Sequence, residues 1–268
     1  MNTHNPGFFF DGTVAEIADH AASLIIVEAY RSVANHGRFS MVLAGGTSPR
    51  ILYQKLAEGV TTELLEHYNL PVPEWRKQRR LTHHPLPGHT WFFQGDERCV
   101  PIDHPESNYK MIRESLLSST AMPEHNFLRM KADEADTEAA ARRYEGTIRS
   151  FFFPGKSLSR ERFPVFDLIL LGLGDDGHTA SLFADNPAIL QEKRRWVLPV
   201  NAPKGKPPGM RLTLTLPIIN HARNIIFFTT GKDKSELAKK IFLEKESGLP
   251  ATLVKPENGI VYWFTSRA

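Results

Sequence analysis

The chain contains a single cysteine, Cys99, among its 268 residues. An intrachain disulfide is therefore excluded, and a reducing compartment is indicated. No apolar run approaches the ~18 residues that a membrane-spanning helix needs. The N-terminus also lacks the basic region, apolar core and cleavage site of a signal peptide. We therefore expect a cytoplasmic protein that does not interact with membranes.

The chain also has no strong excess of positive or negative charge. Lys and Arg total 33 against 30 Asp and Glu, which gives a formal net charge of +3 with histidine neutral. This balance is too mild to predict a nucleic-acid partner, although a modest positive field would suit a small anionic substrate. The apolar fraction of 41% is ordinary for a globular protein with a buried core.

Short apolar runs alternate with amphipathic segments along the chain. The predicted strands cover residues 8–10, 40–44, 90–93, 166–171, 196–200, 225–229 and 260–264. The predicted helices cover residues 13–35, 50–57, 111–117, 133–153 and 231–243. This alternation predicts an α/β fold: a doubly wound, mostly parallel, Rossmann-like sheet with helices on both faces.

One region interrupts this pattern. Residues 59–89 hold four prolines, the basic run Arg76–Arg80, and the histidines His83, His84 and His89. Such residues occur in metal sites and nucleic-acid patches, but a short basic run is more often a solvated loop face. We therefore expect one domain over residues 1–268 with a loop insert at about 59–89, and neither a metal site nor nucleic-acid binding.

The segment from Phe166 to Asp185 carries the strongest functional signal. Its apolar start predicts a strand buried on both faces, and glycines then permit a tight turn. Asp176 and His178 follow at the carboxyl end of this strand, where ligands of open α/β sheets usually bind. A carboxylate two residues from an imidazole supplies a base and a group to orient it. These two residues are therefore candidate catalytic residues. Residues 179–181 are predicted to open a helix or a turn.

The same glycines offer an alternative. Gly172, Gly174 and Gly177 match the Gly-x-Gly-x-x-Gly pattern of dinucleotide-binding loops. However, Asp175 and Asp176 would place negative charge where that loop receives a pyrophosphate. No acidic residue follows at the end of the next predicted strand either. Both features disfavour a dinucleotide site.

A second candidate site follows the strand at residues 40–44. Gly45 and Gly46 let backbone amides approach an anion, and the hydroxyls of Thr47 and Ser48 add donors. Pro49 then suits the first turn of a helix. No Walker loop is present, because no Gly-Lys-Ser/Thr sequence occurs. The segment predicts either a phosphate-binding loop or a simple strand-to-helix turn.

Charged residues also mark the ends of other predicted elements. Asp96 and Arg98 follow the strand at residues 90–93, which is more typical of a site than of a surface cluster. Arg211 begins the alternating extended segment RLTLTL. Lys234 lies near a helix N-terminus and opposes its dipole, so it is either tolerated at the surface or used to bind an anion.

Taken together and in this order, these motifs resemble the 6-phosphogluconolactonase family, which shares its fold with the glucosamine-6-phosphate isomerases and deaminases. The matching segments are LAGGTSP at 43–49, GDERCVP at 95–101 with His104, Ser107 and Asn108, GLGDDGHTASLF at 172–183, RLTLT at 211–215, and GKDK at 231–234. The resemblance covers most of the chain from Phe39 onward.

The resemblance implies hydrolysis of 6-phospho-D-glucono-1,5-lactone to 6-phospho-D-gluconate, the second step of the oxidative pentose phosphate pathway. It implies no cofactor and no metal requirement. We expect His178 to activate a water molecule, and Asp176 or Asp96 to orient the imidazole or the water. Residues 45–48 would bind the 6-phosphate together with Arg98, Arg211 and Lys234. We expect a monomer or a small homo-oligomer.

Two alternatives to the lactonase are a deaminase and a non-catalytic sugar-phosphate-binding domain. Deaminase relatives place a glutamate five residues after the histidine, where this chain has Phe183. The missing carboxylate favours the lactonase. A binding domain would have no evident use for Asp176 and His178. The chain departs from the family at Ala184 and Asp185, where relatives commonly carry Pro-Gly. The resemblance therefore does not predict the conformation of this turn.

Overall fold

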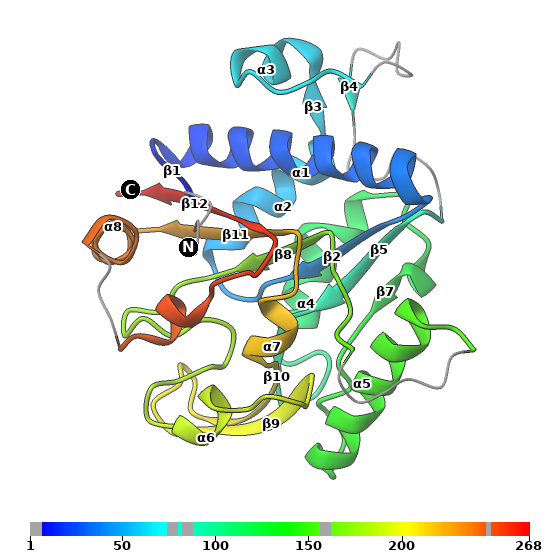
Figure 1. The fold of residues 1–268 in the computed structure, drawn as a ribbon, viewed down its shortest axis with the longest axis vertical. Coiled ribbons are helices and arrows are strands. Elements are labelled where there is room, and N and C mark those ends of the chain that lie inside the picture. The colour runs from blue at the N-terminus through cyan, green and yellow to red at the C-terminus, as the bar shows by residue number, and fades with distance from the viewer. Residues whose placement is uncertain (1–6, 74–79, 82–87, 156–161, 245–247) are drawn as a thin grey trace.

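The computed structural model describes residues 7–73, 80–81, 88–155, 162–244 and 248–268. Its centre is a seven-stranded sheet with the order β1-β12-β11-β8-β2-β5-β7, in which all neighbouring strands run parallel (Figure 1). These strands are β1 (Phe8–Asp11), β2 (Phe39–Leu43), β5 (Thr90–Gln94), β7 (Phe127–Leu128), β8 (Leu168–Leu171), β11 (Asn224–Thr230) and β12 (Ile260–Ser266). The predicted parallel sheet is confirmed.

Helices cover both faces of this sheet. One face packs against α1 (Val14–His36), α2 (Ser48–Glu58) and α4 (Asn108–Ser115). The other packs against α5 (Thr137–Phe152), α6 (Pro187–Leu190), α7 (Leu216–Ile219) and α8 (Lys232–Lys239). Short turns of 3-10 helix lie at Leu117–Ser119, Glu124–Asn126 and Pro250–Leu253, and a π-helical turn at Lys240–Glu244 follows α8. The doubly wound architecture is therefore confirmed.

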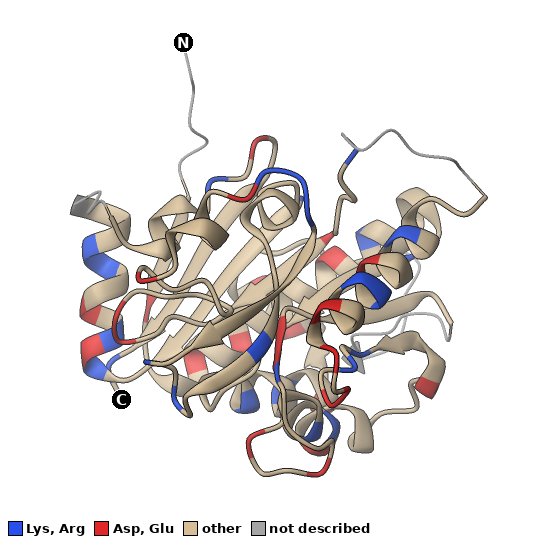
Figure 2. Cartoon of the chain, turned by 90° about the horizontal axis from the view of Figure 1, so that it is seen from below, with Lys and Arg blue, Asp and Glu red and all other residues tan. Residues whose placement is uncertain are grey.

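The strand β8 shows why the sequence takes this form. Leu168 and Leu170 face the core beneath α1 and α2, whereas Ile169 and Leu171 face the core on the α5 side. All four are at most 2% exposed. Because successive side chains of a strand alternate between faces, a strand covered on both sides must be apolar throughout. Charged residues lie mostly on the helices and loops instead (Figure 2).

A second, three-stranded sheet was not expected from the sequence. It consists of β6 (Asp96–Arg98), β10 (Gly209–Leu214) and β9 (Val197–Ala202), paired antiparallel. The predicted strand at 196–200 therefore pairs with β10 in this separate sheet. Its register places Arg98 directly opposite Arg211.

The boundaries of α1 follow the local sequence closely. The hydroxyl of Thr13 accepts a hydrogen bond from the backbone amide of Glu16 at 3.2 Å, and the Glu16 carboxylate accepts one from the amide of Thr13 at 2.8 Å. This reciprocal capping box fixes the start of the helix. Gly37 ends it with a φ of 82°, a left-handed conformation that favours glycine.

The predicted insert is partly described. It contains β3 (Val60–Thr61), α3 (Thr62–His67) and β4 (Arg80–Leu81), with β3 and β4 paired antiparallel. Most of the basic run, together with His83 and His84, lies outside the described residues. Within the described ranges, no helix combines the length and the apolar character that a membrane span requires.

The insert contacts α1 through an aromatic cluster. The ring of Tyr68 stacks on His20 of α1 at 4.1 Å between centroids, and Phe10 meets the edge of the His20 ring. His20 is 9% exposed, and its Nδ1 has no hydrogen-bond partner among the described residues. Burial lowers the pKa of His20 from 6.5 to about 4. The imidazole is therefore neutral at neutral pH.

His20 should make the stability of the fold depend on pH. Its pKa is lower in the folded than in the unfolded chain, so its contribution is complete above about pH 6.5 and is lost as the pH falls toward about 4. We expect the free energy of unfolding to drop by roughly 2 to 3 kcal/mol over this interval from this group alone. Urea unfolding at several pH values should show a shallower pH dependence for His20→Gln. The exposed His125→Gln should behave as the wild type, and an unchanged slope in His20→Gln would contradict the assignment.

Candidate active site

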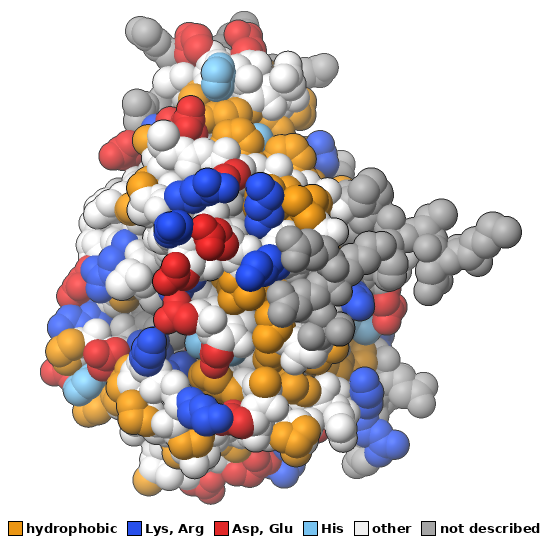
Figure 3. Space-filling model, turned by 90° about the vertical axis from the view of Figure 1, so that its left-hand side faces the viewer, with side chains coloured by type: hydrophobic (Ala, Val, Ile, Leu, Met, Phe, Trp, Pro, Cys, Tyr) orange, Lys and Arg blue, Asp and Glu red, His pale blue; other side chains and the backbone are white. Residues whose placement is uncertain are grey.

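The order of the strands locates the candidate site. From β2 the chain runs outward to β5 and β7 and then returns past β2 to β8 on its other side. At such a switch point the connections diverge and leave a crevice beyond the carboxyl ends of the strands. A cavity of about 760 Å³ lies at this edge, which Figure 3 faces. All ten predicted site residues line it: Gly45, Gly46, Thr47, Ser48, Asp96, Arg98, Asp176, His178, Arg211 and Lys234.

The turn after β8 pairs His178 with Asp176. The Nδ1 of His178 is hydrogen-bonded to the Asp176 carboxylate, which also accepts a bond from the His178 backbone amide at 3.2 Å. Burial alone would raise the pKa of Asp176, but these hydrogen bonds outweigh it and hold the pKa below its usual value. The carboxylate therefore remains charged at neutral pH, favours a proton on Nδ1 and leaves Nε2 as the basic nitrogen.

Gly174 is required by this pairing. It donates its amide to the carbonyl of His178 at 2.8 Å. A Cβ at this position would lie 2.0 Å from Nδ1 of His178 and 2.8 Å from the Asp176 carboxylate. Only glycine leaves room for the imidazole in this orientation.

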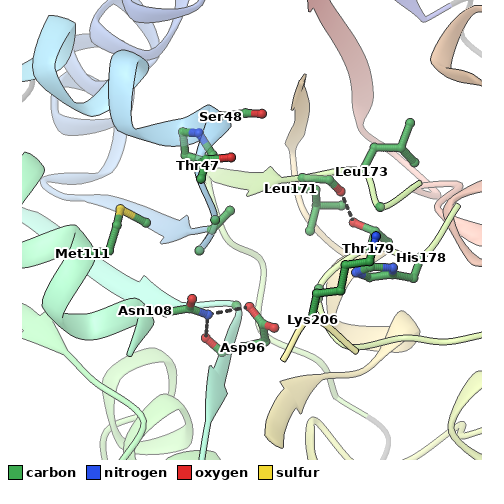
Figure 4. A pocket seen from close by; sticks show the side chains of 18 of the residues that line it. Thr47, Ser48, Asp96, Asn108, Met111, Leu171, Leu173, His178, Thr179 and Lys206 are labelled. Atoms are coloured by element: carbon green, nitrogen blue, oxygen red, sulfur yellow. Dashed lines mark hydrogen bonds between the residues drawn. The ribbon is translucent and has the colours of Figure 1, made fainter. Parts of the chain in front are cut away.

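The segment after His178 is a turn and not a helix. Ala180 adopts a left-handed φ of 48°, and Thr179 forms an isolated bridge with Leu182. The hydroxyl of Thr179 donates to the carbonyl of Gly172 at 2.8 Å (Figure 4). The turn therefore folds back on the end of β8.

Asp96 connects this turn to two other loops. Its carboxylate is buried and accepts a hydrogen bond from the hydroxyl of Ser181 at 2.6 Å. It accepts another from the carboxamide of Asn108 at 3.1 Å (Figure 4). Asn108 in turn lies against Gly45, where a Cβ would fall 1.9 Å from its side-chain oxygen. The sequence did not indicate Ser181 or Asn108 as partners of Asp96, because the three residues come from separate parts of the chain.

Glu97 has a different role from its neighbour. Its buried carboxylate accepts hydrogen bonds from the amides of Asn108 at 2.8 Å and Tyr109 at 2.7 Å, in the first turn of α4. Burial raises the pKa of Glu97. Because a helix N-terminus has unpaired amides and favours negative charge, Glu97 stabilises the start of α4. It does not line the cavity.

Arg98 and Arg211 form a cationic wall. Arg211 is only 3% exposed and donates to the carbonyl of Pro207 at 2.8 Å, while Arg98 donates to the carbonyl of Glu106 at 2.6 Å. Burial lowers the pKa of Arg211. The Nε of both arginines is buried and has no hydrogen-bond partner among the described residues. Buried donors without partners are rare, so this wall favours an anionic ligand.

The loop at residues 45–48 joins β2 to α2. Gly46 has a φ of 96°, and the exposed Thr47 makes no side-chain capping bond. The hydroxyl of Ser48 is hydrogen-bonded to that of Thr230 at 3.0 Å and accepts the Thr230 amide at 3.2 Å. Its hydroxyl therefore ties the loop to β11. The helix begins at Ser48, two residues before the predicted start, so the Gly-Gly-Thr segment leads directly into its N-terminus.

Two lysines meet at the rim of the cavity. Asp175 contacts the ammonium group of Lys206 at 3.1 Å and that of Lys234 at 3.8 Å. Lys206 lies in the loop at 204–208, whose sequence KGKPP consists only of Lys, Gly and Pro. Because these groups are partly or largely exposed, the pairs add little stability. The two lysines place two positive charges where an anion would enter the cavity.

The described residues contain no group of three or more His, Cys, Asp and Glu side chains that could hold a metal ion. Cys99 is half-buried, and burial raises the pKa of its thiol to about 11. It therefore stays protonated at neutral pH and is a poor nucleophile.

The family model described as glucosamine-6-phosphate isomerases/6-phosphogluconolactonase matches residues 12–263. This chain belongs to that family. A 6-phosphogluconolactonase of Synechocystis sp. is 34% identical over 254 residues, which cover 94% of this chain and 92% of that protein. The 6-phosphogluconolactonase of Homo sapiens is 44% identical over 174 residues, covering 65% of this chain and 64% of that protein. The solved structure of 6-phosphogluconolactonase from Trypanosoma cruzi superposes with a TM-score of 0.76 at 29% identity, covering 98% of this chain and 95% of that one.

The two glycines before the His178 pair provide a matched test of its geometry. We expect Gly174→Ala to displace His178 and to lower the free energy of unfolding by about 1 to 3 kcal/mol, because the new methyl group overlaps the imidazole. Gly172→Ala should change neither the position of His178 nor the free energy of unfolding by much, since nothing described lies within 4 Å of a Cβ there. Denaturant unfolding and crystal structures of both variants would measure this. Equal behaviour of the two variants would show that Gly174 is not needed for the pairing.

Proposed function

We propose that this chain hydrolyses 6-phospho-D-glucono-1,5-lactone to 6-phospho-D-gluconate in the pentose phosphate pathway, as the names of its relatives suggest. The observation that carries the proposal is the joint placement of the His178–Asp176 pair and the anion-binding groups around one cavity. A phosphorylated lactone needs both: an activated water at the carbonyl and a positive site for the phosphate.

In the proposed reaction, Nε2 of His178 accepts a proton from a water molecule as its oxygen attacks C1 of the lactone. The bond between C1 and the ring oxygen then breaks, and the same proton is delivered to that oxygen. The product is a carboxylic acid, which ionises at neutral pH. Asp176 keeps the imidazole oriented through Nδ1. General-base assistance of this kind typically contributes 10²–10⁴-fold.

We assign Asp96 a positioning role and not that of a base. Both its carboxylate oxygens accept hydrogen bonds, from Ser181 and Asn108. Moving Asp96 would therefore disturb the loops that carry His178 and Gly45 together. Of the two carboxylates left open by the sequence, Asp176 is the one that contacts the imidazole.

The loop at 45–48, with Lys234 at the start of α8, would bind the 6-phosphate and hold C1 against the water. Holding the lactone in this position lowers the entropy cost of bringing C1 and the water together. Arg98 and Arg211 add positive charge along the same cavity. Their unpaired Nε groups support an anionic ligand or the oxyanion that develops on the carbonyl.

The family also contains glucosamine-6-phosphate isomerases, and the residue at position 183 favours the lactonase over this activity. The Phe183 ring is 2% exposed and packs at 4.3 Å between centroids against His178. An apolar ring there cannot supply a carboxylate for sugar ring opening, which favours the lactonase. No observation favours a non-catalytic binding domain. The absence of a cofactor, the cytoplasmic location and the monomeric or small oligomeric state stay predictions.

A direct assay tests this proposal. We expect hydrolysis of freshly prepared 6-phosphogluconolactone well above its spontaneous rate, and a loss of about 100-fold or more in kcat for His178→Asn with a smaller change in KM. Glucosamine 6-phosphate should be tested in parallel for ammonia release. Ammonia release without lactone hydrolysis would replace the lactonase assignment with the deaminase.

A lysine pair on α8 tests the phosphate site. Lys234 lines the cavity, whereas Lys232 at the same helix start is exposed and does not. We expect Lys234→Ala to raise KM for the lactone about tenfold, because a charged contact to the phosphate is lost. Lys232→Ala should leave KM within about twofold. Equal KM values in the two variants would remove Lys234 from the phosphate site.

A further inference from the structure

The aromatic ring of Phe183 has an unusual place among the buried side chains. It is 2% exposed, yet it belongs to neither of the two apolar core clusters among the described residues. Two functional side chains contact the ring instead. Its centroid lies 4.3 Å from that of His178, with the planes inclined by 30°, and the guanidinium carbon of Arg211 lies 5.5 Å from the ring.

Gly174 and Asp176 also confine the imidazole of His178. The backbone of Gly174 lies so close that a Cβ would reach 2.0 Å from Nδ1, and Asp176 holds the same nitrogen from the edge of the ring. A hydrogen bond at Nδ1 fixes one point of the imidazole but leaves the ring free to swing about it. A flat ring packed on its face removes that freedom, because rotation would drive the two rings into each other.

The turn at 179–183 explains how Phe183 reaches this position. The left-handed Ala180 and the bridge between Thr179 and Leu182 reverse the chain directly after His178. Ser181 is meanwhile hydrogen-bonded to Asp96. The turn is therefore held at both ends, and it brings the fifth residue after the histidine back onto the imidazole.

We propose that Phe183 is a positioning residue that orients the imidazole of His178 by packing on its face. Phe183 does not line the cavity that His178 and Arg211 line, so it acts through these two side chains and not on the substrate. This inference deepens the proposed hydrolysis and rests on it for its kinetic consequence. The packing itself does not depend on the substrate.

The test compares Phe183→Leu, which keeps an apolar side chain but loses the flat face, with Phe183→Tyr, which keeps the face. The matched control is Phe166→Leu, another buried phenylalanine, which packs on Phe93 and Phe152 within the core. In lactone hydrolysis we expect Phe183→Leu to lower kcat about 10- to 100-fold with KM within about threefold, because a misplaced base slows the chemical step. Phe183→Tyr should recover most of kcat, and Phe166→Leu should keep kcat despite a lower melting temperature.

An NMR measurement tests the same inference without any substrate. A ring stacked on the imidazole shields its carbon-bound protons, so Phe183→Leu should move the His178 ring resonances downfield. These resonances are assigned by their disappearance in His178→Asn. Phe166→Leu should leave them unmoved. Unmoved His178 resonances in Phe183→Leu, or a kcat within twofold of the wild type, would overturn the proposal. If the wild type hydrolyses no lactone, the proposed function fails, and the NMR comparison still decides whether the Phe183 ring packs on the face of His178.

Discussion

The buried carboxylate of Asp96 holds the candidate site together. It accepts one hydrogen bond from the turn that follows β8, through Ser181, and another from the start of α4, through Asn108. Asn108 then packs directly against Gly45 of the loop after β2. Three loops from the carboxyl edge of the sheet are thereby fixed to one another. A buried carboxylate destabilises the fold unless its oxygens are hydrogen-bonded. Loss of either bond to Asp96 should therefore weaken the whole arrangement.

The rigid sheet beneath makes this arrangement possible. Strands β2 and β8 are buried on both faces, and their carboxyl ends lie side by side at the point where the strand order reverses. The loops that leave them need only a few residues to meet. The small antiparallel sheet adds the cationic wall, since its register places Arg98 and Arg211 opposite each other on β6 and β10. An anionic substrate would therefore lie between the glycine-rich loop and this wall.

The family contains two chemistries on one fold, so function depends on individual side chains and not on architecture. In this chain the position five residues after His178 holds a buried aromatic ring, and the imidazole is supported by packing as well as by Asp176. This combination suits a base that activates water. It offers no second carboxylate next to the histidine at that position.

The sequence by itself determined most of the elements and the parallel, doubly wound character of the main sheet. Apolar runs such as Leu168–Leu171 identify strands covered on both faces, and Thr13 with Glu16 marks the start of α1. These signals are local, because a strand or a cap is specified by residues that are neighbours in the chain. For the same reason the sequence could place His178 and Asp176 together, two residues apart in one turn.

Only the tertiary structure decided which distant residues meet. The antiparallel pairing of β6 with β10, the bonds from Ser181 and Asn108 to Asp96, and the contact of Lys206 with Asp175 join segments that are separated by 11 or more residues. Such contacts depend on how strands register and loops pack, and the types of the residues do not specify them. The contact of Phe183 with His178 joins residues only five apart, but it also depends on conformation and not on residue type, since a left-handed turn brings the ring onto the imidazole.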